Sequence, residues 1–126
     1  MECVDVKYRQ RTITAFLDTG SDITVAGSSL AKKLKWEIYH YPVTSVKTVN
    51  GVDMLIYGIS YVLLEAENQD IESAVLISFD MTGLILGIDW MEKQNCMFNC
   101  PKRKIKICGE WIQLKREPTS TKVRRI

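Results

Sequence analysis

Hydrophobic and polar residues alternate with a period of two over most of the chain, which is the pattern of half-buried β-strands. Val4, Val6 and Tyr8 alternate with charged residues, and an RQRT turn separates them from a second β-rich run at residues 12–17. A third short run covers residues 22–25. The first part of the chain therefore predicts three short strands.

The next segment, residues 28–35 (SSLAKKLK), changes to a helical pattern. Leu30 and Leu34 are four residues apart and share one helix face, while Ser28 or Ser29 can cap the N-terminus. We expect one short helix here.

A hairpin is predicted at Asn50-Gly51, because both residues accept the positive φ angles of a tight turn. Its arms are the β-rich residues 41–49 and 52–66, and the polar tip allows the hairpin to project from the core. A strand is predicted at residues 73–78, followed by a loop at 79–83. Four acidic residues are predicted to lie in a solvated loop before this strand: Glu65, Glu67, Asp70 and Glu72.

The last part begins with LILG, residues 84–87, an apolar run suited to a buried strand, in which Gly87 permits close backbone approach. A helix is predicted over residues 88–95, with acidic residues early and Lys93 late. A second hairpin turns at Pro101-Lys102, and a last strand covers residues 110–114. The three tryptophans are expected to pack in the core or an interface: Trp36, Trp90 and Trp111. With many short strands and no βαβ alternation, the fold class is all-β.

Length and composition fit one domain, since 126 residues with 46% hydrophobic content can bury one core. We place this domain at residues 1–114 and interpret the basic, Pro-containing residues 115–126 as a flexible tail, with a phosphate-binding arm as the alternative. A net charge of +2 favours neither nucleic acid nor membrane as a partner.

The N-terminus lacks the apolar region of a signal peptide, and no apolar run has the roughly 20 residues that span a bilayer. Four dispersed cysteines favour a reducing compartment and hence a cytoplasmic, non-secreted protein. Cys96 and Cys100 match no common zinc spacing, so we expect no metal and no cofactor.

Candidate chemistry lies in FLDTGSD, residues 16–22, where an apolar strand runs into Asp18. These residues also suit an ordinary turn. His40 is the one histidine, and neither a G-x-S-x-G motif nor a glycine-rich phosphate loop is present. Among the catalytic chemistries considered, the one based on carboxyl groups remains. Acid–base hydrolysis needs two carboxyl groups, one charged and one protonated, and a symmetric dimer supplies the second Asp18.

The triplet Asp18-Thr19-Gly20, the Asn50-Gly51 hairpin and the later LILGIDW segment resemble, in this order, the retropepsin family. These are the homodimeric aspartic proteases of retroviruses and LTR retrotransposons, with their domesticated relatives. The resemblance extends from Glu2 to Leu114 and is greatest to the gypsy-like branch. It implies a protomer built as a closed, barrel-like β-sandwich with a flap hairpin and one or two short helices.

The resemblance also implies residue roles. The two Asp18 carboxyl groups would meet at the dimer axis and share one proton, as the paired carboxyl groups of aspartic proteases do. The Thr19 hydroxyl would hydrogen bond to the backbone of the partner's loop, and Gly20, which lacks a Cβ, would let the loop backbone approach the substrate. Leu86 and Gly87 would support the loop from behind. Further substrate-binding residues are Ser21 and Asp22 in the cleft, with the flap residues Val49, Asn50, Gly51, Val52, Asp53 and Met54.

Two positions depart from retroviral members of the family. Ile88 stands where those enzymes often carry an Arg that supports the dimer, and Ser21 stands where many carry Ala. Asp89 follows the gypsy-like pattern and is also placed to interact with the helix dipole.

Taken together, the resemblance implies a homodimeric aspartic endopeptidase that cleaves extended polypeptide, for example a retroelement polyprotein inside virus-like particles. The alternative is a domesticated module that keeps the dimeric fold for binding, with weak or no proteolysis.

Overall fold

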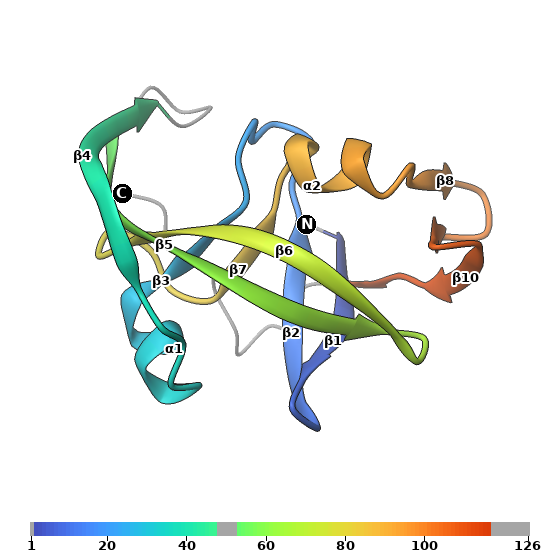
Figure 1. The fold of residues 1–126 in the computed structure, drawn as a ribbon. Helices are drawn as coiled ribbons and strands as arrows, with labels where there is room; N and C mark the ends of the chain where they lie inside the picture. The colour runs from blue at the N-terminus through green and yellow to red at the C-terminus, as the bar shows by residue number, and fades with distance from the viewer. Residues whose placement is uncertain (1, 48–52, 117–126) are drawn as a thin grey trace.

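The protein is described by a computed structural model covering residues 2–47 and 53–116. Its elements follow one another along the chain as β1 (Glu2–Tyr8), β2 (Arg11–Leu17), β3 (Val25–Gly27), α1 (Ser28–Lys33), β4 (Tyr39–Lys47), β5 (Asp53–Ala66), β6 (Gln69–Ser78), β7 (Leu84–Leu86), α2 (Ile88–Lys93), β8 (Met97–Asn99), β9 (Lys104–Ile107), β10 (Glu110–Gln113) and β11 (Lys115–Arg116). Strands dominate, so the predicted all-β class is confirmed (Figure 1).

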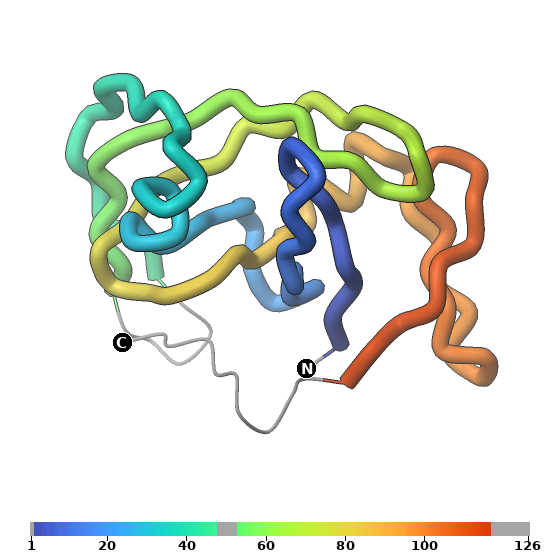
Figure 2. Tube along the Cα trace, turned by 90° about the horizontal axis from the view of Figure 1, so that it is seen from below, coloured from blue at the N-terminus to red at the C-terminus, as the bar shows by residue number. Residues whose placement is uncertain are grey.

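The main sheet curls into a barrel. Its strands are ordered β11-β1-β2-β7-β3-β6-β5-β4, and an additional pairing of Lys7 with Glu65 joins β1 to β5. The six strands from β1 to β5 in this order therefore form a closed ring, while β11 and β4 extend it at either side. A separate three-stranded sheet, β10-β9-β8, lies at the opposite end of the molecule from α1 (Figures 1 and 2).

Two buried clusters explain why β7 and the last residues of β2 are apolar without alternation. On β2, Ala15 and Leu17 join the larger cluster, whereas Phe16 joins a smaller one with Met54 and Ile85. Both faces of β2 and of β7 are therefore covered. This arrangement is the reason that the LILG run shows no polar alternation.

The acidic segment differs from its prediction as a loop. Residues 65–72 continue the β5 and β6 strands, which pair from Ile56 with Ser78 to Ala66 with Gln69. The turn consists of Glu67 and Asn68 alone, both with positive φ (47° and 63°), as a two-residue hairpin turn requires. The outward-facing acids concealed the alternation with buried residues such as Ile71.

Smaller differences concern element ends. The predicted strand at 22–25 is displaced to β3, and α1 begins after Gly27 with no side-chain cap, so neither Ser28 nor Ser29 caps it. Of the three tryptophans expected in the core or an interface, Trp36 and Trp90 are buried in the core, and Trp111 is 44% exposed on this chain. Residues 115–116 of the predicted tail pair with β1 as β11, and residues 117–126 lie outside the described ranges.

No helix within residues 2–47 and 53–116 has the length and apolar character needed to cross a membrane.

Candidate active site

Asp18 lies directly after β2, where the parallel neighbour β7 holds the backbone. Leu17 pairs with Leu86, and the Asp18 N–H donates to the carbonyl oxygen of Leu86 at 3.1 Å. Asp18 as a whole residue is only 9% exposed, and its Oδ1 accepts a hydrogen bond from the Gly20 N–H at 3.0 Å. The carboxyl group is therefore fixed in position at the end of a buried strand.

The Asp-Thr-Gly triplet forms a tight turn. The Ser21 N–H donates to the Asp18 carbonyl oxygen at 3.1 Å, and the Ser21 hydroxyl donates to the Ile23 carbonyl oxygen at 2.8 Å. Thr19 and Gly20 are exposed at the tip of this turn, whereas Ser21 is half-buried. The loop thus presents its tip to solvent while its carboxylate is held below the surface.

Gly87 supports this loop from behind, and the close backbone approach predicted for it is present. A Cβ atom at this position would lie 2.5 Å from the carbonyl carbon of Ile23 and 2.8 Å from the Ser21 oxygen. The next residue, Ile88, donates its N–H to the same Ser21 oxygen at 2.8 Å. The segment after β7 and the triplet loop are therefore in direct backbone contact.

A buried hydroxyl that the sequence analysis missed, that of Thr24, connects the two segments. Thr24 is 1% exposed; its Oγ1 donates to Asp89 Oδ1 at 2.7 Å and accepts from the Gly87 N–H at 3.1 Å. The Thr24 N–H donates to Asp89 Oδ2 at 3.2 Å, and the Trp90 N–H donates to Asp89 Oδ1 at 2.6 Å. Asp89 thus anchors the loop after Asp18, in addition to its place in the first turn of α2.

The arms of the predicted flap hairpin are present as β4 and β5, which pair from Tyr39 with Ile59 to Lys47 with Asp53. The predicted tip residues lie outside the described ranges: Val49, Asn50, Gly51 and Val52. Asp53 is exposed, whereas Met54 is buried in the smaller cluster.

A second feature that the sequence did not reveal holds the first residues of β5 in this hairpin. The Leu55 N–H donates to Asp80 Oδ2 at 2.8 Å, and Asp80 follows β6 in the chain. Beside it, the rings of Tyr57 and Phe79 stack at 4.1 Å between centroids with an interplanar angle of 7°. The loop after β6 is therefore attached to the hairpin by both contacts.

The thiol of Cys96 lies in a partly apolar environment. Burial, with a smaller contribution from Cys108, raises its pKa to about 11, so this thiol is protonated at neutral pH. Across residues 2–47 and 53–116, no cluster of three or more His, Cys, Asp or Glu side chains is arranged to hold a metal ion.

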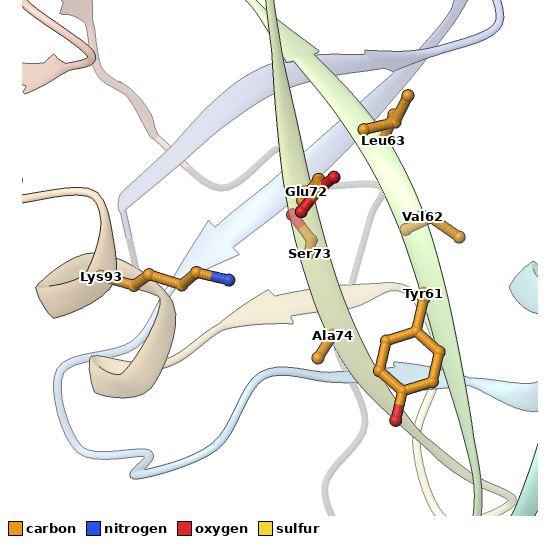
Figure 3. Close-up of a pocket in the computed structure, with 7 residues that line it drawn as sticks. All are labelled: Tyr61, Val62, Leu63, Glu72, Ser73, Ala74 and Lys93. Carbon is orange, nitrogen blue, oxygen red and sulfur yellow. The ribbon is translucent and has the colours of Figure 1, made fainter.

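A hollow of about 420 Å³ lies against the outer side of β5 and β6, with Lys93 of α2 extending towards Glu72 and Ser73 (Figure 3). It is lined by Tyr61, Val62, Leu63, Glu72, Ser73, Ala74 and Lys93. None of residues 18–22 contributes to it, so this hollow is separate from the Asp18 site.

Comparison with solved structures identifies the fold. The retroviral protease-like domain of Ddi1 from Leishmania major superposes with a TM-score of 0.77 at 18% identity, over 94% of this chain and 97% of that one. EIAV protease, solved with the inhibitor HBY-793, superposes with a TM-score of 0.62 at 20% identity, over 77% of this chain and 90% of that one. A foamy viral protease–reverse transcriptase, solved with an RNA/DNA hybrid, gives 0.52 at 19% identity, over 72% of this chain and 11% of that one.

No protein-family model matches the sequence, and no curated protein sequence matches it either. The structural similarity nevertheless covers almost the whole chain. The protein therefore has the retropepsin-like fold, and the resemblance found in the sequence is confirmed at the level of fold.

Proposed function

We propose that this chain is one half of a homodimeric aspartic endopeptidase, in which Asp18 of each subunit contributes one carboxyl group. The observation that carries the proposal is the position of Asp18, a buried carboxyl group fixed by the Leu86 backbone. The neighbouring Thr19 and Gly20 are exposed, so the loop is accessible to a second copy. EIAV protease, a protease by name, has the same fold.

The chemistry follows from placing two such carboxyl groups within hydrogen-bond range. They cannot both ionise, so the pair holds one proton. The ionised Asp18 takes a proton from water as the water oxygen attacks the peptide carbonyl carbon, and the protonated Asp18 donates its proton to the carbonyl oxygen. The Asp18 that took the water proton then donates it to the amide nitrogen and the C–N bond breaks. The other Asp18 takes a hydroxyl proton as the new carboxylic acid forms, so two shorter peptides leave and the pair again holds one proton.

The proposed substrate is an extended polypeptide. A peptide in this conformation can add its backbone to exposed strand edges, so its alternate side chains determine specificity. Ser21 and Asp22 follow the catalytic loop directly, and the β4–β5 hairpin would close over the peptide from the other side. A groove shared between two subunits does not exist in one chain, so no cavity at Asp18 is expected in a single protomer.

The proposal is tested by incubating the protein with a peptide library and reading cleavage by mass spectrometry. We expect cleavage that an aspartic-protease transition-state analogue blocks and that peaks at acidic to near-neutral pH. Asp18→Asn is expected to abolish cleavage while keeping the fold, because an amide cannot exchange the shared proton. Asp70→Asn, a matched change at an exposed strand position, should leave cleavage unchanged.

Full activity of Asp18→Asn, or a rate that peaks above about pH 9, would contradict this mechanism. A wild-type protein that forms a stable dimer but cleaves no peptide would favour the alternative, a binding module.

A further inference from the structure

Charge is distributed unevenly along this chain. Residues 100–126 contain nine of the 17 Lys and Arg residues but only two of the 15 Asp and Glu residues, so this segment carries a charge of +7. The first 99 residues carry −5. The total of +2, which predicted no nucleic-acid partner, hides this asymmetry. A basic segment joined to an acidic domain is typical of a surface that binds a polyanion.

The three-stranded sheet β8–β10 presents two of these nine basic residues, Lys104 and Lys106, on one face. By strand register, Met97, Lys106 and Trp111 lie side by side in one row across the sheet. A second row, directly adjacent, contains Asn99, Lys104 and Gln113. We call these six residues the basic face.

On the opposite side of the same sheet, the central strand β9 faces the core. Ile105 and Ile107 alternate with the two lysines and are 0% and 1% exposed. Glu110, the one acidic residue of segment 100–116, pairs with Ile107 and therefore lies on the side away from the basic face. The charge of the basic face is thus undiluted by acids from its own strands.

The lysines of the basic face are available to a ligand. Arg103 and Lys115 form ion pairs with Glu2 and Asp5, respectively. Neither Lys104 nor Lys106 forms an ion pair with a carboxylate of residues 2–47 or 53–116. Their positive charges remain for an external anion.

Trp111 gives this face an aromatic surface. It is 44% exposed, whereas the other two tryptophans, Trp36 and Trp90, are 5% and 3% exposed. The ammonium group of Lys106 lies 5.9 Å from the centre of the Trp111 ring. An exposed ring beside a cation can bind a nucleobase by stacking while the cation binds the adjoining phosphate.

Local hydrogen bonds hold the face rigid. Asn99 Oδ1 accepts from the Lys102 N–H at 3.2 Å, and Gln113 Nε2 donates to the Arg103 carbonyl oxygen at 2.9 Å. Both amides thereby fix the turn between β8 and β9. A rigid sheet loses little entropy when it binds a flexible strand.

We propose that the basic face of β8–β10 binds single-stranded nucleic acid, with Trp111 stacking on a base and with Lys104 and Lys106 contacting phosphates. A sheet that carries an exposed aromatic residue among lysines suits unpaired bases. Insertion into a membrane requires a broad apolar surface. Here the two apolar side chains, Met97 and Trp111, lie on either side of Lys106.

The test uses the full chain and a fluorescein-labelled oligothymidylate of about 20 nucleotides, followed by fluorescence anisotropy at several salt concentrations. We expect binding that weakens as salt rises. Lys104→Gln/Lys106→Gln should weaken it about 10- to 100-fold at low salt and reduce the log–log salt slope by about 1.4. Lys32→Gln/Lys33→Gln, the same change of charge on α1 at the other end of the molecule, should leave it unchanged.

Stacking has its own readout. Nucleic acid should quench the intrinsic fluorescence of Trp111, because the buried Trp36 and Trp90 are inaccessible to bases. Trp111→Ala should weaken binding about 5- to 100-fold with little change in the salt slope, and Trp111→Phe should retain most of the affinity.

The proposal is overturned if the oligonucleotide does not bind, or if the α1 variant loses as much affinity as the β9 variant. Binding to heparin, poly-glutamate or phosphatidylserine vesicles that is as tight as binding to the oligonucleotide, without quenching of Trp111, would also overturn it. In that case the face recognises charge alone. These outcomes do not depend on whether the Asp18 site cleaves peptides.

Discussion

Replacing Gly87 with alanine is the substitution whose effect follows most directly from the geometry. The added Cβ would lie 2.5 Å from the Ile23 carbonyl carbon and 2.8 Å from the Ser21 oxygen, and closer still to the Ile23 oxygen. These are backbone atoms of the loop that follows Asp18, so no rotamer change relieves the contact. The loop must therefore recede from β7 by roughly 1 Å to restore normal van der Waals distances.

The substitution is expected to lower both the stability of the fold and the rate of cleavage. Overpacking of this kind costs about 1–3 kcal/mol, and we expect the upper half of that range because the clash involves backbone. A displacement of about 1 Å at a catalytic group costs about 100-fold in rate. Asp18 is hydrogen bonded to Leu86, the residue before Gly87, so the displacement reaches the carboxyl group that we propose to be catalytic.

The assay combines urea denaturation with peptide cleavage. A cost of 2–3 kcal/mol lowers the urea midpoint by about 1–2 M. Gly109→Ala is the control: its Cβ would meet nothing within 4 Å, but its φ of +85° strains an alanine. The control should lose about 1 kcal/mol and keep its activity. If Gly87→Ala matches the wild type in both midpoint and cleavage rate, the supporting role of this contact is refuted.

Two further predictions concern the buried hydroxyl of Thr24 and the half-buried thiol of Cys96, which precedes β8. Thr24→Val keeps the shape of the side chain but removes the hydroxyl that donates to Asp89 and accepts from the Gly87 N–H. We expect a loss of about 2 kcal/mol in stability, which lowers Tm by about 6–10 °C in thermal melting. An unchanged Tm would contradict this. Iodoacetamide should modify Cys96 more slowly than the exposed Cys100, because the pKa of Cys96 is raised to about 11; peptide mass spectrometry measures both rates, and equal rates would contradict it.

The raised pKa of Cys96 also makes the stability of the fold depend on pH. An unfolded cysteine thiol loses its proton near pH 9.0, whereas the folded Cys96 keeps it up to about pH 11. The folded state therefore binds this proton more tightly, and its stability should fall as pH rises between these two values. Cys96→Ser is expected to remove this part of the pH dependence in denaturation experiments.

Local patterns predicted much of the fold. Three signals depend only on residues that are close together in the sequence. They are the alternating residues of β1 and β2, the Asn50-Gly51 signal between β4 and β5, and the apolar run of β7. The family resemblance further implied that the LILG segment supports the Asp18 loop from behind, and the structure brings these two segments into backbone contact.

Contacts between distant segments were not predictable in this way. Thr24 looked like an ordinary strand residue, and its role arises only because folding brings Asp89, 65 residues later, within hydrogen-bond range. The β5–β6 turn was missed because Glu67-Asn68 lacks the glycine of a typical hairpin signal. Trp111 was expected in the core or an interface, and residue type alone could not decide between them; its register on β10 places it on the outer face of the small sheet.

The central claim, that two copies of Asp18 form one active site, is tested most directly by mixing. Wild-type and Asp18→Asn chains are unfolded together, refolded at fixed total concentration, and assayed for peptide cleavage. If each active dimer needs two intact carboxyl groups, an equal mixture retains about a quarter of the wild-type rate, because activity follows the square of the wild-type fraction. A rate of about a half, falling in proportion to that fraction, would mean that the site is complete in one chain.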